Sequence, residues 1–184
     1  MRIVGGRLKG RALRGPAADA IRPTSDRLRE TLFNILIHSY GDPIEGARVL
    51  DLFAGTGAMA IEALSRGARF ALFVDQSAEA CALIRGNIET FGLGDATRVL
   101  RRDARKLGAS SADDRFSLAF LDPPYGKGLA PQALLALRDG GWLDKDALLL
   151  VEETAQSEVP LPEGFALIET RTYGDTQVMF VRAT

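Results

Sequence analysis

The sequence is poor in three features that mark particular classes of protein: cysteine, histidine and long apolar runs. A single cysteine, Cys81, in 184 residues excludes a scaffold held together by internal disulfides. One histidine, His38, and one cysteine leave no Cys/His cluster of the kind that binds a metal ion. The longest unbroken apolar runs, such as Ala147–Val151, are far shorter than the roughly 20 residues that a membrane-spanning helix needs, and the first residues lack the apolar stretch of a secretory signal. We therefore expect a cytoplasmic protein with no membrane span and no metal, and we expect a monomer.

The composition is that of a folded globular protein, but its charge is unevenly distributed. Hydrophobic residues make up 46% of the chain, which excludes general disorder, and the length predicts one main domain. The net charge is −1, yet residues 1–30 carry eight basic and three acidic residues, whereas residues 139–184 carry three basic and nine acidic residues. A polyanionic partner would therefore bind the N-terminal end. The basic residues of the first 15 positions, which contain no acid, are Arg2, Arg7, Lys9, Arg11 and Arg14.

The N-terminal 20 residues differ in pattern from the rest of the chain. Arg2–Val4 and Arg11–Leu13 are predicted to be short strands of a basic β-hairpin extension, and residues 15–20 have the composition of a linker. Residues 21–184 form the main domain, which opens with a helix because apolar residues recur at helical spacing up to Leu36. Thr24 is the predicted N-cap of this helix.

From Ala47 onward, short apolar runs alternate with helical patterns. The runs are nearly continuous in apolar residues, which is typical of a parallel sheet covered by helices on both faces. The end of the chain instead predicts an antiparallel hairpin, Phe165–Thr172 and Gln177–Arg182. The predicted fold is α/β, with parallel strands at 48–53, 70–74, 97–100, 116–121 and 147–151 and helices at 58–66, 77–90 and 131–138.

Acidic residues end or follow four successive strands, at the sheet edge where α/β proteins bind ligands: Asp51, Asp75, Asp103 and Asp122. Residues 55–60 also match the G-x-G-x-x-A pattern of a dinucleotide-binding loop, with Asp75 placed 20 residues after its first glycine. Asp51 argues against NAD, because a negative charge just before the loop disfavours a pyrophosphate and favours a cation. Asp75 would accept hydrogen bonds from ribose hydroxyls, and Asp103 from an adenine amino group. A nucleoside with a cationic end, S-adenosylmethionine, fits this set.

The most specific motif is Asp122-Pro123-Pro124-Tyr125, directly after the fourth predicted strand. The two prolines fix φ and stiffen the backbone, so the carbonyl of Pro123 is held as an acceptor. Asp122 and this carbonyl would accept the two N–H bonds of an exocyclic amine, and Tyr125 would stack on the ring that carries it. These contacts return electron density to the nitrogen and orient it, and such positioning is worth ~7–11 kcal/mol. A base inside a duplex cannot reach this pocket, so the base must be flipped out or already unpaired. Asp122 then either takes the proton or only orients the amine.

These motifs resemble those of class I, seven-stranded S-adenosylmethionine-dependent methyltransferases with a Rossmann-like fold. Asp51–Gly57 is similar to their first motif and Asp122–Tyr125 to their D/N-P-P-Y/F motif. Arg2–Arg11 and Arg22–Leu36 are similar to the RsmD family in particular, and the similarity covers essentially the whole chain. The resemblance implies methylation of N2 of the guanine at position 966 of bacterial 16S rRNA, either as rRNA alone or within an assembling small ribosomal subunit.

The resemblance also implies a role for each matching residue. The implied catalytic residues are Asp122, Pro123, Pro124 and Tyr125. The implied rRNA-binding residues are the five basic residues of the first 15 positions, whose phosphate contacts would make binding sensitive to salt. The residues implied to hold or enclose S-adenosylmethionine are Arg22, Thr24, Arg27, Asp51, Phe53, Ala54, Gly55, Thr56, Gly57, Asp75, Gln76, Asp103, Ala104 and Asp122.

Two other functions remain open from the residues. The same pocket would also suit another amino group, such as adenine N6 in DNA or RNA or a protein amide, because the pocket motif alone does not identify the target. An NAD-dependent oxidoreductase that uses the glycine loop is the third hypothesis. Binding of S-adenosylmethionine or of NAD to the purified protein separates the first hypothesis from the third.

Overall fold

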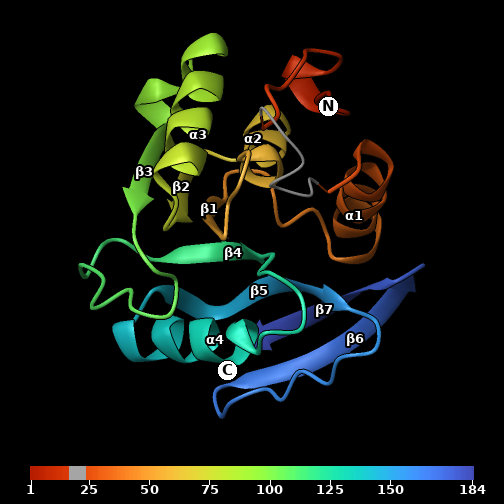
Figure 1. Ribbon diagram of the computed structural model, residues 1–184, viewed down its shortest axis with the longest axis vertical. Helices are drawn as coiled ribbons and strands as arrows, with labels where there is room; N and C mark the ends of the chain where they lie inside the picture. The colour runs from red at the N-terminus through yellow and green to blue at the C-terminus, as the bar shows by residue number, and fades with distance from the viewer. Residues whose placement is uncertain (17–23) are drawn as a thin grey trace.

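A seven-stranded sheet runs through the computed structural model, which describes residues 1–16 and 24–184 (Figure 1). The strand order is β3-β2-β1-β4-β5-β7-β6, and the first five strands of the chain are parallel to one another. The last strand, β7, pairs antiparallel with both β5 and β6. The strands are β1 (Arg48–Leu52), β2 (Phe70–Asp75), β3 (Thr97–Arg101), β4 (Phe116–Leu121), β5 (Leu143–Thr154), β6 (Phe165–Tyr173) and β7 (Thr176–Ala183). The predicted α/β fold with an antiparallel C-terminal hairpin is confirmed.

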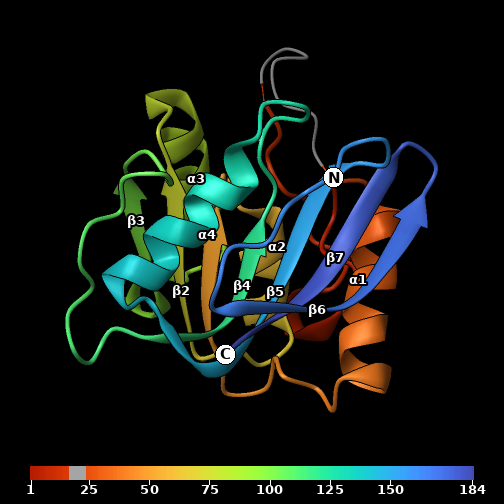
Figure 2. The same cartoon turned by 90° about the horizontal axis from the view of Figure 1, so that it is seen from below.

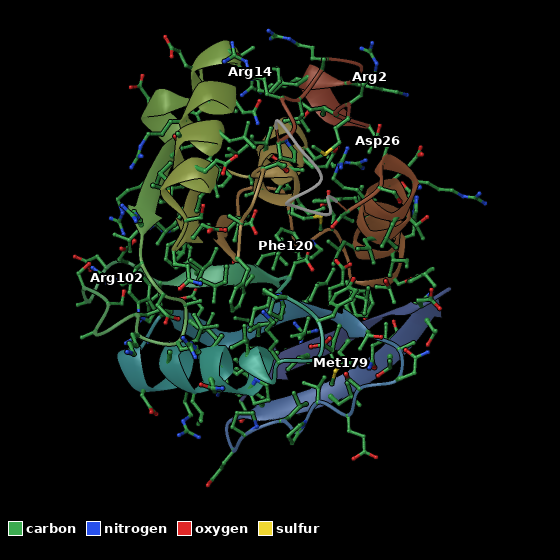
Figure 3. The ribbon with its side chains drawn as sticks, viewed as in Figure 1. Arg2, Arg14, Asp26, Arg102, Phe120 and Met179 are labelled. Atoms are coloured by element: carbon green, nitrogen blue, oxygen red, sulfur yellow. The ribbon has the colours of Figure 1, made fainter. Side chains whose placement is uncertain are left out.

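Helices cover both faces of this sheet, as predicted. The helices α1 (Asp26–Ser39), α2 (Ala58–Ser65) and α3 (Ala78–Thr90) pack on one face, and α4 (Leu129–Gly140) packs on the other (Figure 1, Figure 2). Successive residues of a strand point to opposite sides of the sheet, and the strands are nearly continuous apolar runs. Both faces of the sheet are therefore apolar. Phe120 thus belongs to the core under α1–α3, where its ring lies 5.7 Å from that of Phe33, whereas Met179 belongs to the core under α4 (Figure 3).

Helix α1 begins one residue later than predicted. Ser25 is its N-cap, because the Ser25 side chain accepts a hydrogen bond from the N–H of Leu28 at 3.1 Å. Thr24 instead directs its hydroxyl toward two carboxylates that belong to distant parts of the chain. Neighbouring hydroxyl residues give the same capping signal in a sequence, and here the tertiary contacts of Thr24 decide between them.

The N-terminal segment, residues 1–14, is only partly the predicted hairpin. Arg2 and Ala12 form one isolated antiparallel bridge, and the predicted turn is present, because Arg11 donates its N–H to the carbonyl of Leu8 at 3.2 Å. A 3-10 helix at Gly6–Leu8, which was not predicted, precedes this turn. The apolar side chains of this segment, Ile3, Leu8 and Leu13, are buried in the core under α1–α3. The segment is therefore packed on the main body of the protein, and the predicted domain boundary at residue 20 lies outside the described residues.

A charged cluster inside the protein holds this segment in place. Glu62 of α2 is fully buried, and its two oxygens accept hydrogen bonds from the backbone N–H groups of Val4 and Gly5, each at 2.9 Å. The same carboxylate binds Arg29 of α1 at 3.2 Å and Arg66 at 2.9 Å. Residues 1–3 still pair with residues 10–13, since Ile3 donates to the carbonyl of Arg11 and Leu13 to that of Met1, each at 3.0 Å. Glu62 takes the next two N–H groups, so this pairing does not extend beyond Ile3.

Candidate active site

A cavity opens at the carboxyl edge of the parallel strands. There β1 and β4 are neighbours, because the chain builds outward from β1 toward β3 and later from β4 toward β5. Such a reversal of strand order is where open α/β sheets bind ligands. The cavity has a volume of about 940 Å³, within the range of about 300–1,000 Å³ that is common for small-molecule sites.

The cavity brings together nearly all of the residues predicted to act there. Pro123, Pro124 and Tyr125 line it beside Asp122. Gly57 is not among the lining residues, and Arg22 lies outside the described residues. The other residues that were predicted to hold S-adenosylmethionine all line the cavity: Thr24, Arg27, Asp51, Phe53, Ala54, Gly55, Thr56, Asp75, Gln76, Asp103, Ala104 and Asp122.

The glycine loop between β1 and α2 owes its shape to two unusual residues. Gly57 has φ +80° at the N-cap of α2, and a Cβ added there would lie 3.1 Å from the ring of Phe73. Only glycine combines this conformation with so close an approach. Phe53 has φ +56° although it carries a side chain, a strained conformation that clusters at ligand-binding sites. Gly57 therefore allows the loop to pack closely against Phe73, while Phe53 lines the cavity.

Asp51 lies at the bottom of the cavity and has a structural role that the sequence did not indicate. Its side chain accepts a hydrogen bond from the N–H of Ala60 at 3.2 Å, in the first turn of α2. Gly57 has no side chain to cap this helix, so Asp51 supplies the acceptor from β1. Burial raises the pKa of Asp51 well above 3.8, and the nearby charge of Asp75 raises it further.

Asp75 and Asp103 stand at the ends of β2 and β3, on the side predicted for a nucleoside. The two oxygens of Asp75 accept from the N–H groups of Gly55, at 3.0 Å, and Ser77, at 2.9 Å. Each oxygen keeps a second lone pair for a ligand hydroxyl. Asp103 accepts hydrogen bonds from the side chain and N–H of Arg105, which lower its pKa. Asp103 therefore remains charged and acceptor-only.

A second cluster of polar groups surrounds Asp122 at the end of β4. The Thr24 hydroxyl lies 3.5 Å from Oδ2 of Asp122 and 3.4 Å from Oε2 of Glu152, on β5. Tyr125 donates its hydroxyl to Oε1 of Glu152 at 2.6 Å, and the Tyr125 oxygen is 3.2 Å from the Thr176 hydroxyl. These bonds fix the ring of Tyr125 in the wall of the cavity.

The pKa of Asp122 is raised well above 3.8. Burial is the largest cause, and repulsion by the charges of Glu152 and Asp51 adds to it. The pKa of Tyr125 is raised as well, first by burial and then because its proton is donated to Glu152. Protonation of this part of the cavity is therefore sensitive to the number of carboxylates in it.

Several lining residues were missed by the sequence analysis. Glu152 follows the same rule as the predicted acids, since it lies near the carboxyl end of its strand, but the predicted strand stopped at residue 151. Tyr173, Gly174 and Thr176 of the β6–β7 turn also line the cavity. The sequence identified this turn but contained no signal that it reaches back across the sheet edge.

Asn87 of α3 links the glycine loop to the N-terminal segment. Its side-chain amide donates to the carbonyl of Thr56 at 3.1 Å and to that of Arg14 at 3.2 Å. Its oxygen accepts from the N–H of Arg14 at 2.9 Å. The segment that carries the predicted rRNA-binding residues is therefore joined directly to the loop that lines the cavity.

All five predicted rRNA-binding residues are exposed. Arg2 and Arg14 lie at the same end of the molecule as the N-terminus, near α2 and α3 (Figure 3). Arg11 stacks over the ring of Phe91 at 4.8 Å and donates to the carbonyl of Thr90. Arg27 and Arg102 are further basic residues, and both line the cavity.

The donor set of the cavity fits S-adenosylmethionine. Asp75 keeps lone pairs that ribose hydroxyls could use, and Asp51, which also lines the cavity, would favour a cation there in its ionised form. Among residues 1–16 and 24–184, no group of three or more His, Cys, Asp or Glu side chains is arranged to hold a metal ion. Within the same residues, no helix combines the length and apolar character that crossing a membrane requires.

Comparison with known proteins gives consistent matches over nearly the full chain. A family model described as conserved hypothetical protein 95 matches residues 1–182. Ribosomal RNA small subunit methyltransferase D of Escherichia coli K12 is 36% identical over 175 residues, which are 95% of this chain and 85% of that protein. The Haemophilus influenzae protein of the same name is 32% identical, over 95% of this chain and 89% of its own. The solved structure of the Escherichia coli protein yhhF superposes with a TM-score of 0.84 at 32% identity, over 100% of this chain and 97% of that chain.

Proposed function

Because the chain belongs to the conserved hypothetical protein 95 family, which includes the RsmD-type rRNA methyltransferases, we propose that its cavity transfers a methyl group to N2 of a guanine in 16S rRNA. The chain is an rRNA methyltransferase, with a Rossmann-like fold. The observation that carries the proposal is the position of Asp122-Pro123-Pro124-Tyr125 in the wall of the same cavity as the glycine loop. A methyl donor and an amine acceptor then meet at the β1–β4 switch point.

The donor half of the cavity is assigned to S-adenosylmethionine, which supplies an electrophilic methyl group on a cationic sulfur when bound. Asp75 accepts from the ribose hydroxyls, and Asp103 with Ala104 lies beside the adenine. Asp51 and the loop around Gly55 face the methionine end. Arg27 and Thr24 close the cavity from the N-terminal side, since both line it.

The acceptor half is assigned to a guanine that has been flipped out of its stack. Asp122 and the carbonyl of Pro123 accept the two N–H bonds of N2, which returns electron density to nitrogen and aims its lone pair at the methyl group. Tyr125 stacks on the purine, and its hydroxyl bond to Glu152 keeps the ring from rotating away. As the N–C bond forms, the bond between the methyl carbon and sulfur would break, which leaves S-adenosylhomocysteine as the product. The nitrogen then loses one proton, to Asp122 or to water.

The substrate RNA is assigned to the N-terminal side of the cavity. Five exposed basic residues would contact the phosphates of the RNA there: Arg2, Arg7, Lys9, Arg11 and Arg14. Contacts to phosphates position the RNA but do not read its base sequence. We place the enzyme in the cytoplasm as a monomer that acts on rRNA or on an assembling small subunit.

Methylation of ribosomal RNA with a labelled donor tests the proposal. Purified protein is incubated with labelled S-adenosylmethionine and small subunits, or their extracted 16S rRNA, from cells in which the gene has been deleted. We expect label in 16S rRNA at N2 of one guanine, mapped by nuclease digestion and mass spectrometry. Label at adenine N6, or in a ribosomal protein alone, overturns the guanine assignment.

A further inference from the structure

A second carboxylate, that of Glu152, stands beside Asp122 in the acceptor half of the cavity. It projects from β5, the strand next to β4, and is partly exposed to the cavity. The Thr24 hydroxyl lies within 3.5 Å of an oxygen of each carboxylate, so both point into the same small space. One hydroxyl has one proton and donates to only one of the two at a time.

The remaining contacts hold Glu152 in a fixed direction. Tyr125 donates to its Oε1 at 2.6 Å, a short bond of the kind that charged acceptors make. The hydroxyl of Tyr125 also lies 3.2 Å from that of Thr176, on β7. Two strands and the proline motif therefore fix where this second acceptor lies.

When both are ionised, two adjacent carboxylates form a wall that accepts hydrogen bonds and donates none. Their mutual repulsion is visible in the raised pKa of Asp122. Such a wall is stabilised by a ligand edge that presents neighbouring N–H donors, and it repels an edge on which a donor lies next to a lone pair.

The purine bases differ in this respect. Guanine presents its N1–H and its N2 amino group side by side, which gives adjacent donors. Adenine presents its N6 amino group between two lone pairs, those of N1 and N7. If Asp122 binds the amino group that is methylated, the neighbouring carboxylate faces N1 in either base.

We infer that Glu152 is a specificity-determining residue, which selects guanine by accepting a hydrogen bond from its N1–H while Asp122 holds N2. The inference rests on the proposed methylation of guanine N2. The contact with N1–H would favour the binding of guanine and disfavour the binding of adenine, a discrimination that the proline motif alone does not provide. A site built around a buried hydrogen bond discriminates strongly, because the wrong ligand leaves its polar groups unpaired.

A base analogue separates recognition of N1–H from recognition of the amine. 2,6-Diaminopurine keeps the 2-amino group but has a lone pair at N1 in place of N1–H. We compare methylation of a synthetic rRNA segment with guanine or 2,6-diaminopurine at the target position, assembled into small subunits where RNA alone is not a substrate. For the wild-type protein we expect kcat/KM to be at least about tenfold higher for guanine.

The variant Glu152→Gln gives the complementary result. A glutamine amide presents its oxygen to N1–H of guanine or its NH2 to N1 of diaminopurine, so the guanine preference falls to a ratio near one. Tyr125→Phe is the matched control, because it removes the hydroxyl bond to Glu152 but leaves both carboxylates in place. It lowers the rate on both bases and retains the preference for guanine.

The outcomes distinguish this inference from the proposed function. Equal kcat/KM of the wild-type protein on the two bases overturns the role of Glu152 and leaves guanine N2 methylation intact. A guanine preference that Glu152→Gln retains shows that Glu152 only supports Tyr125 and also overturns the inference. No methylation of the guanine segment by wild-type protein overturns the proposed function and the inference together. The wild-type comparison needs no variant, so a variant that fails to fold does not decide the question.

Discussion

Three aspartates near the ends of neighbouring strands differ in burial, pKa and hydrogen-bond partners. Asp51 is buried, caps α2 and has a raised pKa. Asp75 binds two backbone N–H groups and keeps lone pairs toward the cavity. Asp122 lies among other carboxylates beneath the hydroxyl of Thr24. All three are aspartates within one residue of the carboxyl end of a strand, and what each carboxylate contacts makes them different.

The role of Asp122 predicts a loss of turnover without a loss of donor binding. Replacing Asp122 by alanine removes the acceptor that orients N2, and we expect kcat to fall by roughly 10²-fold or more. Calorimetric titration with S-adenosylmethionine should show an affinity close to that of the wild type, because the nucleoside half of the cavity is unchanged. A near-normal kcat would remove Asp122 from the mechanism.

The raised pKa of Asp122 predicts the direction of the pH dependence. Asp122 accepts N–H bonds in its ionised form, and its pKa lies well above 3.8, so kcat should rise with pH through that raised value. Glu152→Gln removes one of the like charges that raise this pKa, and the rising limb should move to lower pH. Initial rates at saturating substrates, measured from about pH 5 upward, check this. An identical profile in wild type and variant would contradict the coupling of the two carboxylates.

At the scale of elements, the sequence predicted what depends on local pattern. Apolar runs such as 70–74 and 116–121 became β2 and β4, and the turn at 173–176 joins β6 to β7. The carboxyl edge of the sheet and its glycine loop follow from these elements. A strand can be predicted from its own residues alone, and the sequence shows directly whether an acidic residue follows it.

Contacts between distant residues could not be predicted in this way. No repeating pattern in the sequence indicates the hydrogen bond from Ala60 to Asp51 or those made by Asn87. The same is true of the burial of Glu62 beside Val4. The short extent of the N-terminal hairpin was missed for the same reason, because the N–H groups of Val4 and Gly5 bond a side chain of α2. Glu152 was missed because the predicted fifth strand was too short to include it.

The buried cluster around Glu62 predicts a large effect of a small change. Glu62→Gln keeps the size of the side chain but removes the charge that pairs with Arg29 and Arg66, which leaves buried charge uncompensated. We expect the free energy of unfolding to fall by about 3–5 kcal/mol, as measured by urea denaturation. Asp139→Asn is the control, because it removes the charge from an exposed ion pair with Arg138 and should change stability little. Equal losses of unfolding free energy in the two variants would show that the buried ion pairs of Glu62 contribute no more to stability than an exposed ion pair.

At the scale of the whole molecule, charge and site are arranged to suit an RNA substrate. The net charge is only −1, but the basic N-terminal segment lies on the α2 and α3 side and is bonded to the glycine loop through Asn87. Truncating this segment would expose the core around Ile3 and Leu13 and remove the bonds of Arg14 to Asn87, so deletion is a poor test of RNA binding. Changing the charge of exposed side chains is a cleaner one.

The double variant Arg7→Glu with Lys9→Glu should weaken RNA binding and leave the donor site intact. Both side chains are exposed, and each lost phosphate contact should reduce the slope of log affinity against log salt by about 1. Filter binding of 16S rRNA at several salt concentrations measures this slope. Lys145→Glu, a single charge reversal at the exposed start of β5, is the control. An RNA affinity as high as that of the control variant would place the RNA on another face.

The cavity is lined by residues from Thr24 to Thr176, which is nearly the whole length of the chain. The turn at Tyr173–Thr176 that joins β6 to β7 supplies one wall, opposite in the chain to the wall at Thr24. A partly folded molecule that has formed the glycine loop and the parallel strands, but has not yet added β6 and β7, therefore lacks a complete catalytic centre. Competence to modify rRNA is a property of the fully assembled sheet and of none of its parts.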